Sequence, residues 1–173
     1  ILIIGFGSIG KRHYKNLIDL GYKDIFVFDV NEGSFEGFEN VKRIKDLKEG
    51  VLAGFKAVFI CSPNNMHIKH ALIYAGAGAH LFIEKPLSHN LNGLRELENI
   101  CRKKRLITMI GCNMRFHPCL EFIKKCLDKK MLGRVYSIRH EFGYFLPYWR
   151  PTQDYRKNYA AKKSTGGGII LDD

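Results

Sequence analysis

The sequence predicts an α/β fold in which helices cover both faces of a doubly wound parallel sheet. Short apolar runs typical of buried strands alternate with segments of helical periodicity along residues 1–118. A glycine-rich turn follows the first of these runs at Gly5, and the alternation ends near Gly133. We therefore expect a domain over residues 1–118 that contains the sheet. Residues 119–173 would belong to a second domain.

The expected strands are short runs of β-branched, aromatic and other apolar residues, each ended by a polar residue, glycine or proline. In chain order they are residues 1–4, 25–28, 41–44, 56–61, 80–83 and 106–110. A longer strand is expected over residues 135–145, where Arg139 and Glu141 would point outward.

The expected helices bring apolar residues to one face at three- and four-residue spacing. The first repeats at Ile9, His13, Leu17 and Leu20, and a short helix covers residues 46–52. The next two have apolar faces made of Ile68, Ala71, Leu72 and Ala75, and of Leu91, Leu94, Leu97, Ile100 and Cys101. Pro118 suits the first turn of a further helix. The apolar face of that helix is Leu120, Phe122, Ile123, Cys126 and Leu127.

The glycine-rich turn has the spacing of a dinucleotide-binding fingerprint. It reads Gly5-Phe6-Gly7-Ser8-Ile9-Gly10. The first glycine would permit the tight turn, the second would let phosphates approach the backbone, and the third would let the helix pack closely on the sheet. The N-terminus of that helix would face a pyrophosphate with free N–H groups and its dipole. These features predict the phosphate site of a Rossmann fold.

Asp29 ends the second apolar run, about 20 residues after the glycine motif. A carboxylate at this place accepts hydrogen bonds from ribose hydroxyls and repels a 2′-phosphate. The sequence therefore predicts NAD(H) rather than NADP(H). A flavin or S-adenosylmethionine site with a similar glycine turn, and a glycine-rich turn without a ligand, are the alternatives.

The composition is that of a globular protein, with 46% hydrophobic and 26% charged residues, and no apolar stretch has the length of a membrane span. The five cysteines form no C-x-x-C pair, and Cys119 and Cys126 fit the apolar face of a helix. We therefore expect free thiols in the cytoplasm and no metal site. The net charge of +11 lies at helix ends and polar helix faces, so no nucleic-acid partner is expected.

Three strand ends have polar residues where ligands bind in open α/β sheets. They are Ser62-Pro63-Asn64 with His67, Glu84-Lys85-Pro86, and residues 113–116, which include Asn113 and Arg115. Lys85 is the strongest catalytic candidate, because a lysine that follows a buried strand and is fixed by a proline would stay near the nicotinamide. Partly buried there, it would exchange a proton with the substrate. The alternative is a surface lysine paired with Glu84.

Together these motifs resemble the family of glucose–fructose oxidoreductase, inositol dehydrogenase and rhizopine-catabolism proteins (Gfo/Idh/MocA). The resemblance extends to Gly166-Gly167-Gly168 and Asp172 near the end of the chain. It implies that Lys85 hydrogen-bonds the hydroxyl being oxidised and that the Lys85–Pro86 peptide is cis. It also implies that the cofactor is bound by the glycine motif, Asp29, Ser62, Pro63, Asn64, His67, Glu84, Lys85, Asn113 and Arg115.

The resemblance further implies that Asp172 holds the substrate or orients a catalytic histidine four residues later. That position lies beyond Asp173, and the chain starts inside its first strand without Met. We therefore expect a fragment that binds NAD(H) without turnover. The resemblance also implies that residues 119–173 are the start of an α+β substrate and dimerisation domain that is mostly missing. It implies in addition that the full-length protein is a homo-oligomer.

Trp149, Arg150 and Tyr155 belong to a stretch that resembles a branch of the family often encoded with surface-glycan biosynthesis genes. Aromatic faces stack on sugar rings, and arginine binds carboxylate or phosphate through paired hydrogen bonds. We expect a small carbohydrate substrate, anionic or nucleotide-linked, that contacts these residues, Lys85 and Asp172. The alternative is that the aromatic residues cover a domain junction.

These features are compatible with three functions. The first is an oxidoreductase that moves hydride between a nicotinamide and a sugar, cyclitol or nucleotide-sugar hydroxyl. The second uses transient oxidation for epimerisation or glycoside cleavage, without net redox change. The third is a cofactor-sensing binding protein without catalysis, against which Lys85 and Asp172 argue.

Overall fold

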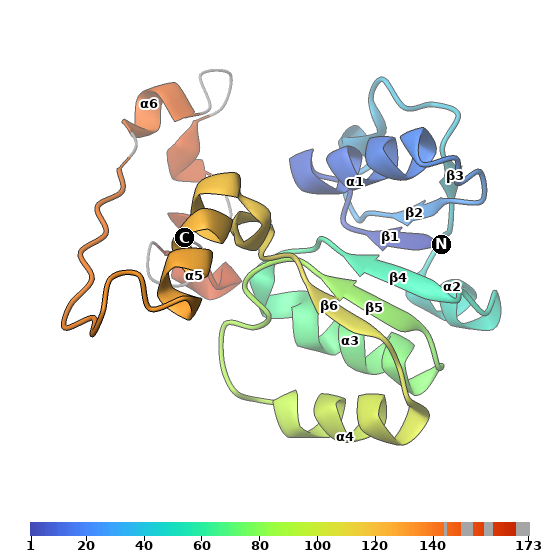
Figure 1. The fold of residues 1–173 in the computed structure, drawn as a ribbon. Coiled ribbons are helices and arrows are strands. Elements are labelled where there is room, and N and C mark those ends of the chain that lie inside the picture. The colour runs from blue at the N-terminus through green and yellow to red at the C-terminus, as the bar shows by residue number, and fades with distance from the viewer. Residues whose placement is uncertain (144, 150–153, 158–160, 169–173) are drawn as a thin grey trace. The chain divides into compact units, whose positions relative to one another are not determined.

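The computed structural model describes residues 1–143, 145–149, 154–157 and 161–168 (Figure 1). The chain divides into two compact units, Ile1–Gly111 with Tyr159–Asp173, and Cys112–Asn158. The second unit begins directly after the sheet, and the segment from residue 159 groups with the first unit. The two domains expected from the sequence, divided at residue 118, stay a prediction.

The described residues of the first unit form a six-stranded sheet in which every pair of neighbours is parallel. Its strands are β1 (Leu2–Ile4), β2 (Phe26–Phe28), β3 (Lys42–Arg43), β4 (Ala57–Ile60), β5 (His80–Ile83) and β6 (Thr108–Ile110). Their order is β3-β2-β1-β4-β5-β6. The predicted doubly wound sheet is therefore confirmed, with its switch point between β1 and β4.

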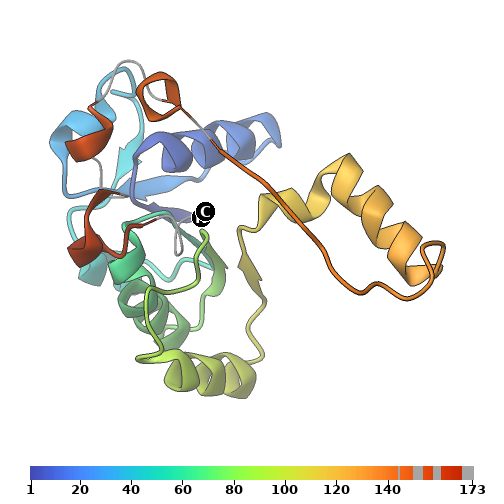
Figure 2. The same cartoon turned by 90° about the vertical axis from the view of Figure 1, so that its left-hand side faces the viewer.

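Helices cover both faces of this sheet (Figures 1 and 2). The helix α1 (Ser8–Asp19) lies on one face, and α3 (His67–Gly76) and α4 (Leu94–Lys104) lie on the other, while α2 (Leu47–Leu52) precedes β4. Alternate residues of a strand point to opposite faces. Ile3 accordingly packs in the same core cluster as Leu17 of α1, and Ile4 packs in the cluster that contains Ala71 of α3.

Two leucines predicted to lie on buried helix faces are exposed. Leu20 follows the last residue of α1 and is 73% exposed, and Leu91 is 85% exposed. Gly93 has a φ of 77°, which is not a helical angle, so α4 begins only at Leu94. Leu91 therefore lies outside the helix whose spacing it fits.

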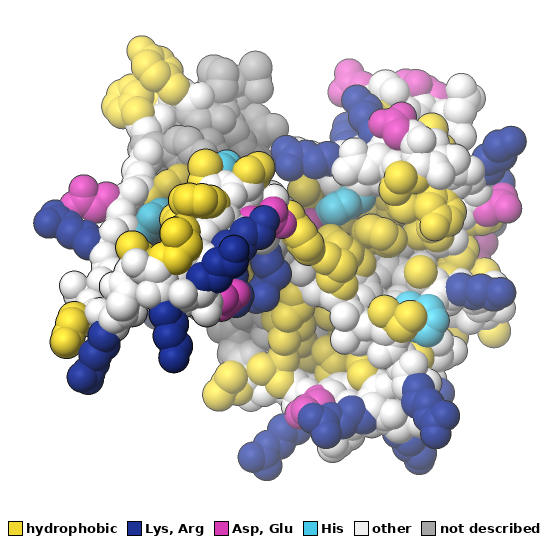
Figure 3. Space-filling model, in the orientation of Figure 1, with side chains coloured by type: hydrophobic (Ala, Val, Ile, Leu, Met, Phe, Trp, Pro, Cys, Tyr) yellow, Lys and Arg dark blue, Asp and Glu magenta, His cyan; other side chains and the backbone are white. Residues whose placement is uncertain are grey.

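The sheet ends at an exposed edge strand, β6. Met109 and Ile110 are 45% and 39% exposed, and Figure 3 shows hydrophobic side chains on this side of the first unit. A hollow of about 610 Å³ beside β6 is lined by residues of α4 and of β6. No helix in the described part of the chain combines the length and the hydrophobicity that a membrane span needs.

The second unit consists of short helices and irregular segments. The helix α5 (Pro118–Asp128) begins at the predicted proline, and the His117 side chain caps it by accepting a hydrogen bond from the Cys119 N–H at 3.2 Å. A further short helix, α6, covers Leu146–Trp149. Two 3₁₀ turns, Asn113–Phe116 and Tyr155–Lys157, complete its described regular structure.

Two expectations for the second unit are wrong. Residues 135–143 have no regular secondary structure, because a strand needs ladder hydrogen bonds to a neighbour and no described residue supplies them. Phe122 and Ile123 on the expected apolar face of α5 are 66% and 48% exposed, and Cys119 is exposed as well. Burying them would require a packing partner that the described residues of this unit do not provide.

Candidate functional site

The segments that follow β1, β4 and β5 lie side by side at one edge of the sheet. The Gly5 N–H donates to the carbonyl of Phe28, the last residue of β2, at 2.8 Å. The N–H groups of Cys61 and Glu84 donate in the same way to the last residues of β1 and β4, at 2.7 and 2.9 Å. Two of the three strand ends predicted to form a site, those after β4 and β5, thus lie beside the glycine turn, at the carboxyl edge where open α/β sheets bind ligands.

The three glycines of the turn occupy three different environments. Gly5 has a φ of +93°, and a Cβ there would lie 2.5 Å from the Cys61 carbonyl oxygen. A Cβ on Gly10 would lie 2.0 Å from the Gly5 carbonyl oxygen. A Cβ on Gly7 would meet nothing within 4 Å. The fold therefore requires glycine at positions 5 and 10, while position 7 leaves open space.

The open position is the N-cap of α1. Gly7 precedes Ser8, no side chain caps the helix, and its first turn contains no acidic residue. The first N–H groups of a helix lack intrahelical partners and lie at the positive end of its dipole. An anion such as a pyrophosphate fits here, because it would meet these donors and no carboxylate of the first turn.

Asp29 lies beside the glycine turn at the end of β2. Its two carboxylate oxygens accept hydrogen bonds from the Phe6 N–H at 2.5 Å and from the Asn31 N–H at 2.8 Å. The first bond joins Asp29 to the glycine turn and the second to the turn that follows β2. The carboxylate is therefore held in place close to the phosphate position, as the ribose of a dinucleotide requires.

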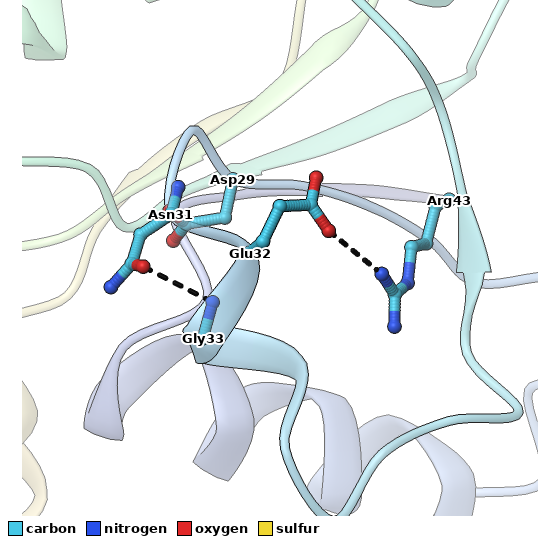
Figure 4. Close-up of polar contacts among 5 residues, drawn as sticks. All are labelled: Asp29, Asn31, Glu32, Gly33 and Arg43. Atoms are coloured by element: carbon cyan, nitrogen blue, oxygen red, sulfur yellow. Dashed lines mark hydrogen bonds and ion pairs between the residues drawn. The ribbon is translucent and has the colours of Figure 1, made fainter.

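A second acidic side chain lies on the turn that follows β2 (Figure 4). Glu32 pairs with Arg43 of β3 at 3.1 Å, and the Arg43 guanidinium also lies 3.8 Å from the centroid of the Phe35 ring. Asn31 completes the turn by accepting a hydrogen bond from the Gly33 N–H at 3.1 Å. The nearby arginine is thus already paired with a carboxylate.

The Lys85 turn has the predicted backbone but not the predicted burial. The Lys85–Pro86 peptide is cis, as the resemblance implied. Lys85 is exposed rather than partly buried. Glu84 bonds to His13 of α1, at 2.6 Å between Oε1 and Nε2. The alternative in which Glu84 serves as the surface partner of Lys85 therefore lacks support, because the Glu84 carboxylate is directed to α1.

The segment after β4 is held by contacts within the chain. His67 is 1% exposed, and its ring nitrogens lie 2.7 Å from the Ser62 carbonyl oxygen and 2.8 Å from the Pro86 carbonyl oxygen. Asn64 is 2% exposed and donates to the Gly166 carbonyl at 3.0 Å. Both side chains are almost completely buried, whereas residues that line an open site are exposed. Their contacts with a cofactor stay a prediction.

The glycine-rich segment near the end of the chain lies against the residues that follow β4. Gly166 has a φ of +80°, and a Cβ there would lie 2.8 Å from His89 Cβ and 3.0 Å from Asn64 Cβ. Asn65 donates to the Ser164 carbonyl at 3.1 Å. Sequence analysis placed this motif only by resemblance, because nothing local to residues 164–168 indicates where they pack.

Burial shifts the pKa of two groups next to the site. Burial lowers the pKa of His70 to about 4, with a smaller contribution from His67 and Lys69. Its Nδ1 lies 2.9 Å from the Ser62 hydroxyl oxygen. Burial, with the charge of Glu84, raises the pKa of the Cys61 thiol. Neither group is therefore charged at neutral pH, so Cys61 lacks the thiolate that a nucleophile needs.

The other predicted site residues lie in the second unit or outside the described residues. Asn113, Arg115 and Tyr155 are in the second unit. Arg156, next to Tyr155, pairs there with Asp154 at 2.9 Å. Arg150 and Asp172 lie outside the described residues, as does the side chain of Trp149.

All five cysteines are free thiols, as the sequence predicts. No three metal-ligating side chains gather among the residues that the structure describes. Sequence analysis also missed one residue of the site, His13. Its only sequence signal is its place on the buried face of the first helix, where a histidine in an otherwise apolar series needs a polar partner.

With the geometry established, comparison with known proteins identifies the class. Residues 1–112 match the family described as "Oxidoreductase family, NAD-binding Rossmann fold" (Gfo/Idh/MocA). The match covers more than half of the chain, which belongs to this family. The resemblance drawn from the motifs is therefore confirmed.

Several relatives match over almost the whole chain. Glucose-6-phosphate 3-dehydrogenase of Bacillus subtilis (strain 168) is 26% identical over 99% of this chain and 51% of its own length. Myo-inositol 2-dehydrogenase of Thermotoga maritima is 28% identical over 98% of this chain and 50% of its own length. The chain thus spans about half the length of the curated relatives it matches.

Solved structures have the same fold. Myo-inositol 2-dehydrogenase from Lactobacillus plantarum matches with a TM-score of 0.70 and 25% identity over 78% of this chain and 42% of that one. The WlbA dehydrogenase from Chromobacterium violaceum, in complex with NADH and UDP-GlcNAcA, matches with a TM-score of 0.70 over 78% of this chain and 41% of that one. Its identity is 19%, so this second match shows the fold alone.

Proposed function

We propose that the chain forms the NAD(H)-binding part of an oxidoreductase that acts on a hydroxyl of a sugar or cyclitol. The observation that carries this proposal is the open position at Gly7, at the uncapped N-terminus of α1 and beside the Asp29 carboxylate. Donors for a pyrophosphate and an acceptor for a ribose lie together there. Membership of an oxidoreductase family supports the reaction class.

The proposed cofactor is NAD(H) rather than NADP(H). Asp29 and Glu32 place two negative charges on the segment that would meet the adenosine ribose. An arginine can accommodate a 2′-phosphate, but the nearby Arg43 is paired with Glu32. A 2′-phosphate would therefore meet repulsion from carboxylates before it met an available cation.

Lys85 is the proposed catalytic residue. A bound nicotinamide supplies a hydride donor or acceptor. Lys85, directly after β5 at the edge that contains the glycine turn, would hold the substrate oxygen and share its proton. Ser62, Pro63, Asn64, His67, Glu84, Asn113 and Arg115 remain proposed cofactor contacts, and Asp172 a proposed substrate and catalytic contact. For the 173 residues alone we expect NADH binding without turnover.

The proposed substrate is a small carbohydrate. By name, the relatives include dehydrogenases of glucose 6-phosphate and myo-inositol, and WlbA was solved with a nucleotide sugar. Trp149, Arg150 and Tyr155 are proposed to contact the sugar, and a role in surface-glycan biosynthesis remains part of the proposal. We further propose a cytoplasmic homo-oligomer with neither nucleic acid nor membrane as partner.

The test is a titration of the purified chain with NADH and with NADPH, followed by the fluorescence of the reduced nicotinamide. Saturable binding of NADH, at least about tenfold tighter than that of NADPH, is expected (a free-energy difference of about 1.4 kcal/mol). Asp29→Asn should weaken NADH binding and reduce the preference. Lack of saturable NADH binding would overturn the proposal, and equal affinities would overturn its NAD(H) part.

Two other functions predict different results in the full-length protein. An epimerase or glycosidase that uses transient oxidation would form product without accumulating NADH. A cofactor-sensing protein would keep its function after Lys85→Ala, whereas the proposed enzyme would lose orders of magnitude in rate while still binding NAD. Sugars, sugar acids and nucleotide sugars are the substrates to screen.

A further inference from the structure

The turn that contains Lys85 is held by a histidine on each side. Glu84, before Lys85, bonds to His13 of α1, and the carbonyl of Pro86, after it, lies 2.8 Å from a ring nitrogen of His67 at the start of α3. The helices α1 and α3 lie on opposite faces of the sheet (Figures 1 and 2). The two neighbours of Lys85 are therefore held from opposite faces of the sheet, Glu84 through its side chain and Pro86 through its backbone carbonyl.

His13 holds Glu84 from the α1 face. Its side chain is 15% exposed and that of Glu84 is 14% exposed. The imidazole packs against the rings of Phe59 and Phe82, with centroid distances of 5.5 and 4.9 Å. The sheet thus fixes the ring, and the hydrogen bond joins it to a carboxylate that is largely removed from water. Such a bond contributes more than one at the surface.

The end of β6 leaves space for this carboxylate. A Cβ on Gly111 would lie 3.0 Å from Cδ and from Oε1 of Glu84. The Gly111 N–H also donates to the carbonyl of Ile83, the residue before Glu84, at 2.8 Å. The Glu84 side chain is therefore enclosed by α1 on one side and by the end of β6 on another.

His67 holds the other side of the turn. It is 1% exposed, and it lies between the Pro86 and Ser62 carbonyl oxygens, at 2.8 and 2.7 Å. Carbonyl oxygens only accept hydrogen bonds, so a neutral imidazole donates to one of them and an imidazolium to both. In either state the ring joins the turn that follows β4 to the turn that follows β5.

We propose that His13 and His67 are positioning residues for Lys85. They hold Glu84 by its carboxylate and Pro86 by its carbonyl, and thereby keep the amine of Lys85 at the edge of the sheet that contains the glycine turn. His13 is about 7.5 Å along α1 from Ser8, so the helix that would bind the pyrophosphate also orients the Lys85 turn. This inference rests on the proposed function, in which the bound nicotinamide lies beside Lys85.

The experiment measures the acetylation rate of individual lysines in the chain, with and without NADH. At about ten times the Kd, bound NADH is expected to slow the acetylation of Lys85 about tenfold. Lys56 is the internal control, because it is exposed and precedes β4 at the opposite edge of the sheet. The Kd for NADH and the Tm are measured on the same samples.

Two variants of His13 separate positioning from packing. His13→Phe keeps a ring against Phe59 and Phe82 but removes the bond to Glu84, whereas His13→Gln keeps a donor and loses the ring. If His13 acts by positioning, NADH should hardly protect Lys85 in the Phe variant. The acetylation rate of Lys85 with NADH should then lie within about twofold of the rate without NADH, and the Kd for NADH should change less than about threefold. The Gln variant should stay close to wild type. If His13 acts only by packing, the Gln variant should lose the protection of Lys85 and the Phe variant should keep it.

Each result has a separate meaning. Full protection of Lys85 in His13→Phe would overturn the proposal, and full protection in His67→Gln would remove His67 from it. If His13→Phe does not fold, Glu84→Gln weakens the same bond from its other side and replaces it. Because Glu84 is also a proposed cofactor contact, the protection of Lys85 in this variant is read at about ten times the variant's own Kd, with no condition on the Kd itself. Wild-type chain that binds NADH without protecting Lys85 would instead overturn the proposed placement of the nicotinamide. Absence of NADH binding would overturn the proposed function itself.

Discussion

The backbone N–H of Phe6 donates to the carboxylate of Asp29 at 2.5 Å and joins the glycine turn to the end of β2. An ionised carboxylate has about four acceptor positions. Phe6 and Asn31 use two of them, which leaves others for ribose hydroxyls. The acceptor for a ribose and the donors for a phosphate are therefore fixed relative to one another by the chain itself.

Alanine at position 10 should mainly reduce stability, whereas alanine at position 7 should mainly weaken NADH binding. Gly10→Ala places a Cβ 2.0 Å from a backbone oxygen, and we expect it to lower the free energy of unfolding by about 3 kcal/mol or more. Gly7→Ala meets no atom within 4 Å and should cost about 1 kcal/mol or less. Its Cβ would enter the proposed phosphate space, so its NADH affinity should fall about tenfold or more.

Denaturant unfolding and NADH fluorescence, measured on both variants, check this prediction. Wild-type NADH affinity in Gly7→Ala would contradict the phosphate site, whereas wild-type stability in Gly10→Ala would contradict the packing of α1 on the glycine turn.

The pair formed by Glu32 and Arg43 should influence the choice of cofactor more than stability. Both side chains are partly or largely exposed, so Glu32→Gln should change the free energy of unfolding by less than about 1 kcal/mol. It removes a negative charge from the ribose segment and releases Arg43 toward a 2′-phosphate. NADPH affinity should therefore rise about two- to fivefold relative to that of NADH.

The matched control is Glu36→Gln, which removes the same charge further along the segment. The ratio of the two dissociation constants is compared between the variants at low salt, where surface charges are least screened. An equal change in both variants would mean that net charge, and not the pairing of Arg43, sets the ratio.

The sheet was predictable because each of its strands has a local signal. The apolar run before Gly5 and the acidic residue at position 29 lie at the two ends of a single strand–helix–strand unit, from β1 to the end of β2, and the structure confirms this unit. The contact of His13 with Glu84 joins residues 71 positions apart, and no local pattern indicates it. The expected strand over residues 135–145 failed for the same reason, since a strand depends on a neighbour that its own sequence does not specify.

His70 should make the stability of the protein depend on pH. Its pKa is lowered from 6.5 to about 4, first by burial and then by the charges of His67 and Lys69. Between these values the unfolded chain binds the proton and the folded chain does not, so stability should rise as the pH rises from 4 to 6.5. The full difference corresponds to about 3 kcal/mol at most.

Chemical denaturation at a series of pH values measures this dependence, with His70→Asn as the comparison that removes the titrating group. Carboxylates also titrate in this range, and the difference between the two profiles isolates His70. Parallel profiles would contradict the buried neutral state of this histidine.

Two helical glycines provide a test of packing on the face of the sheet opposite α1. A Cβ on Gly50 of α2 would lie 2.3 Å from the Tyr74 hydroxyl oxygen and 2.8 Å from Ile44 Cδ1, whereas a Cβ on Gly76 of α3 would meet nothing within 4 Å. Gly50→Ala should therefore lower the free energy of unfolding by about 1–3 kcal/mol. Gly76→Ala should raise it by about 0.5–1 kcal/mol, because alanine loses less backbone entropy in a helix. Thermal and denaturant unfolding of the two variants measure both signs, and a stabilising Gly50→Ala would show that the Tyr74 ring moves aside at little cost.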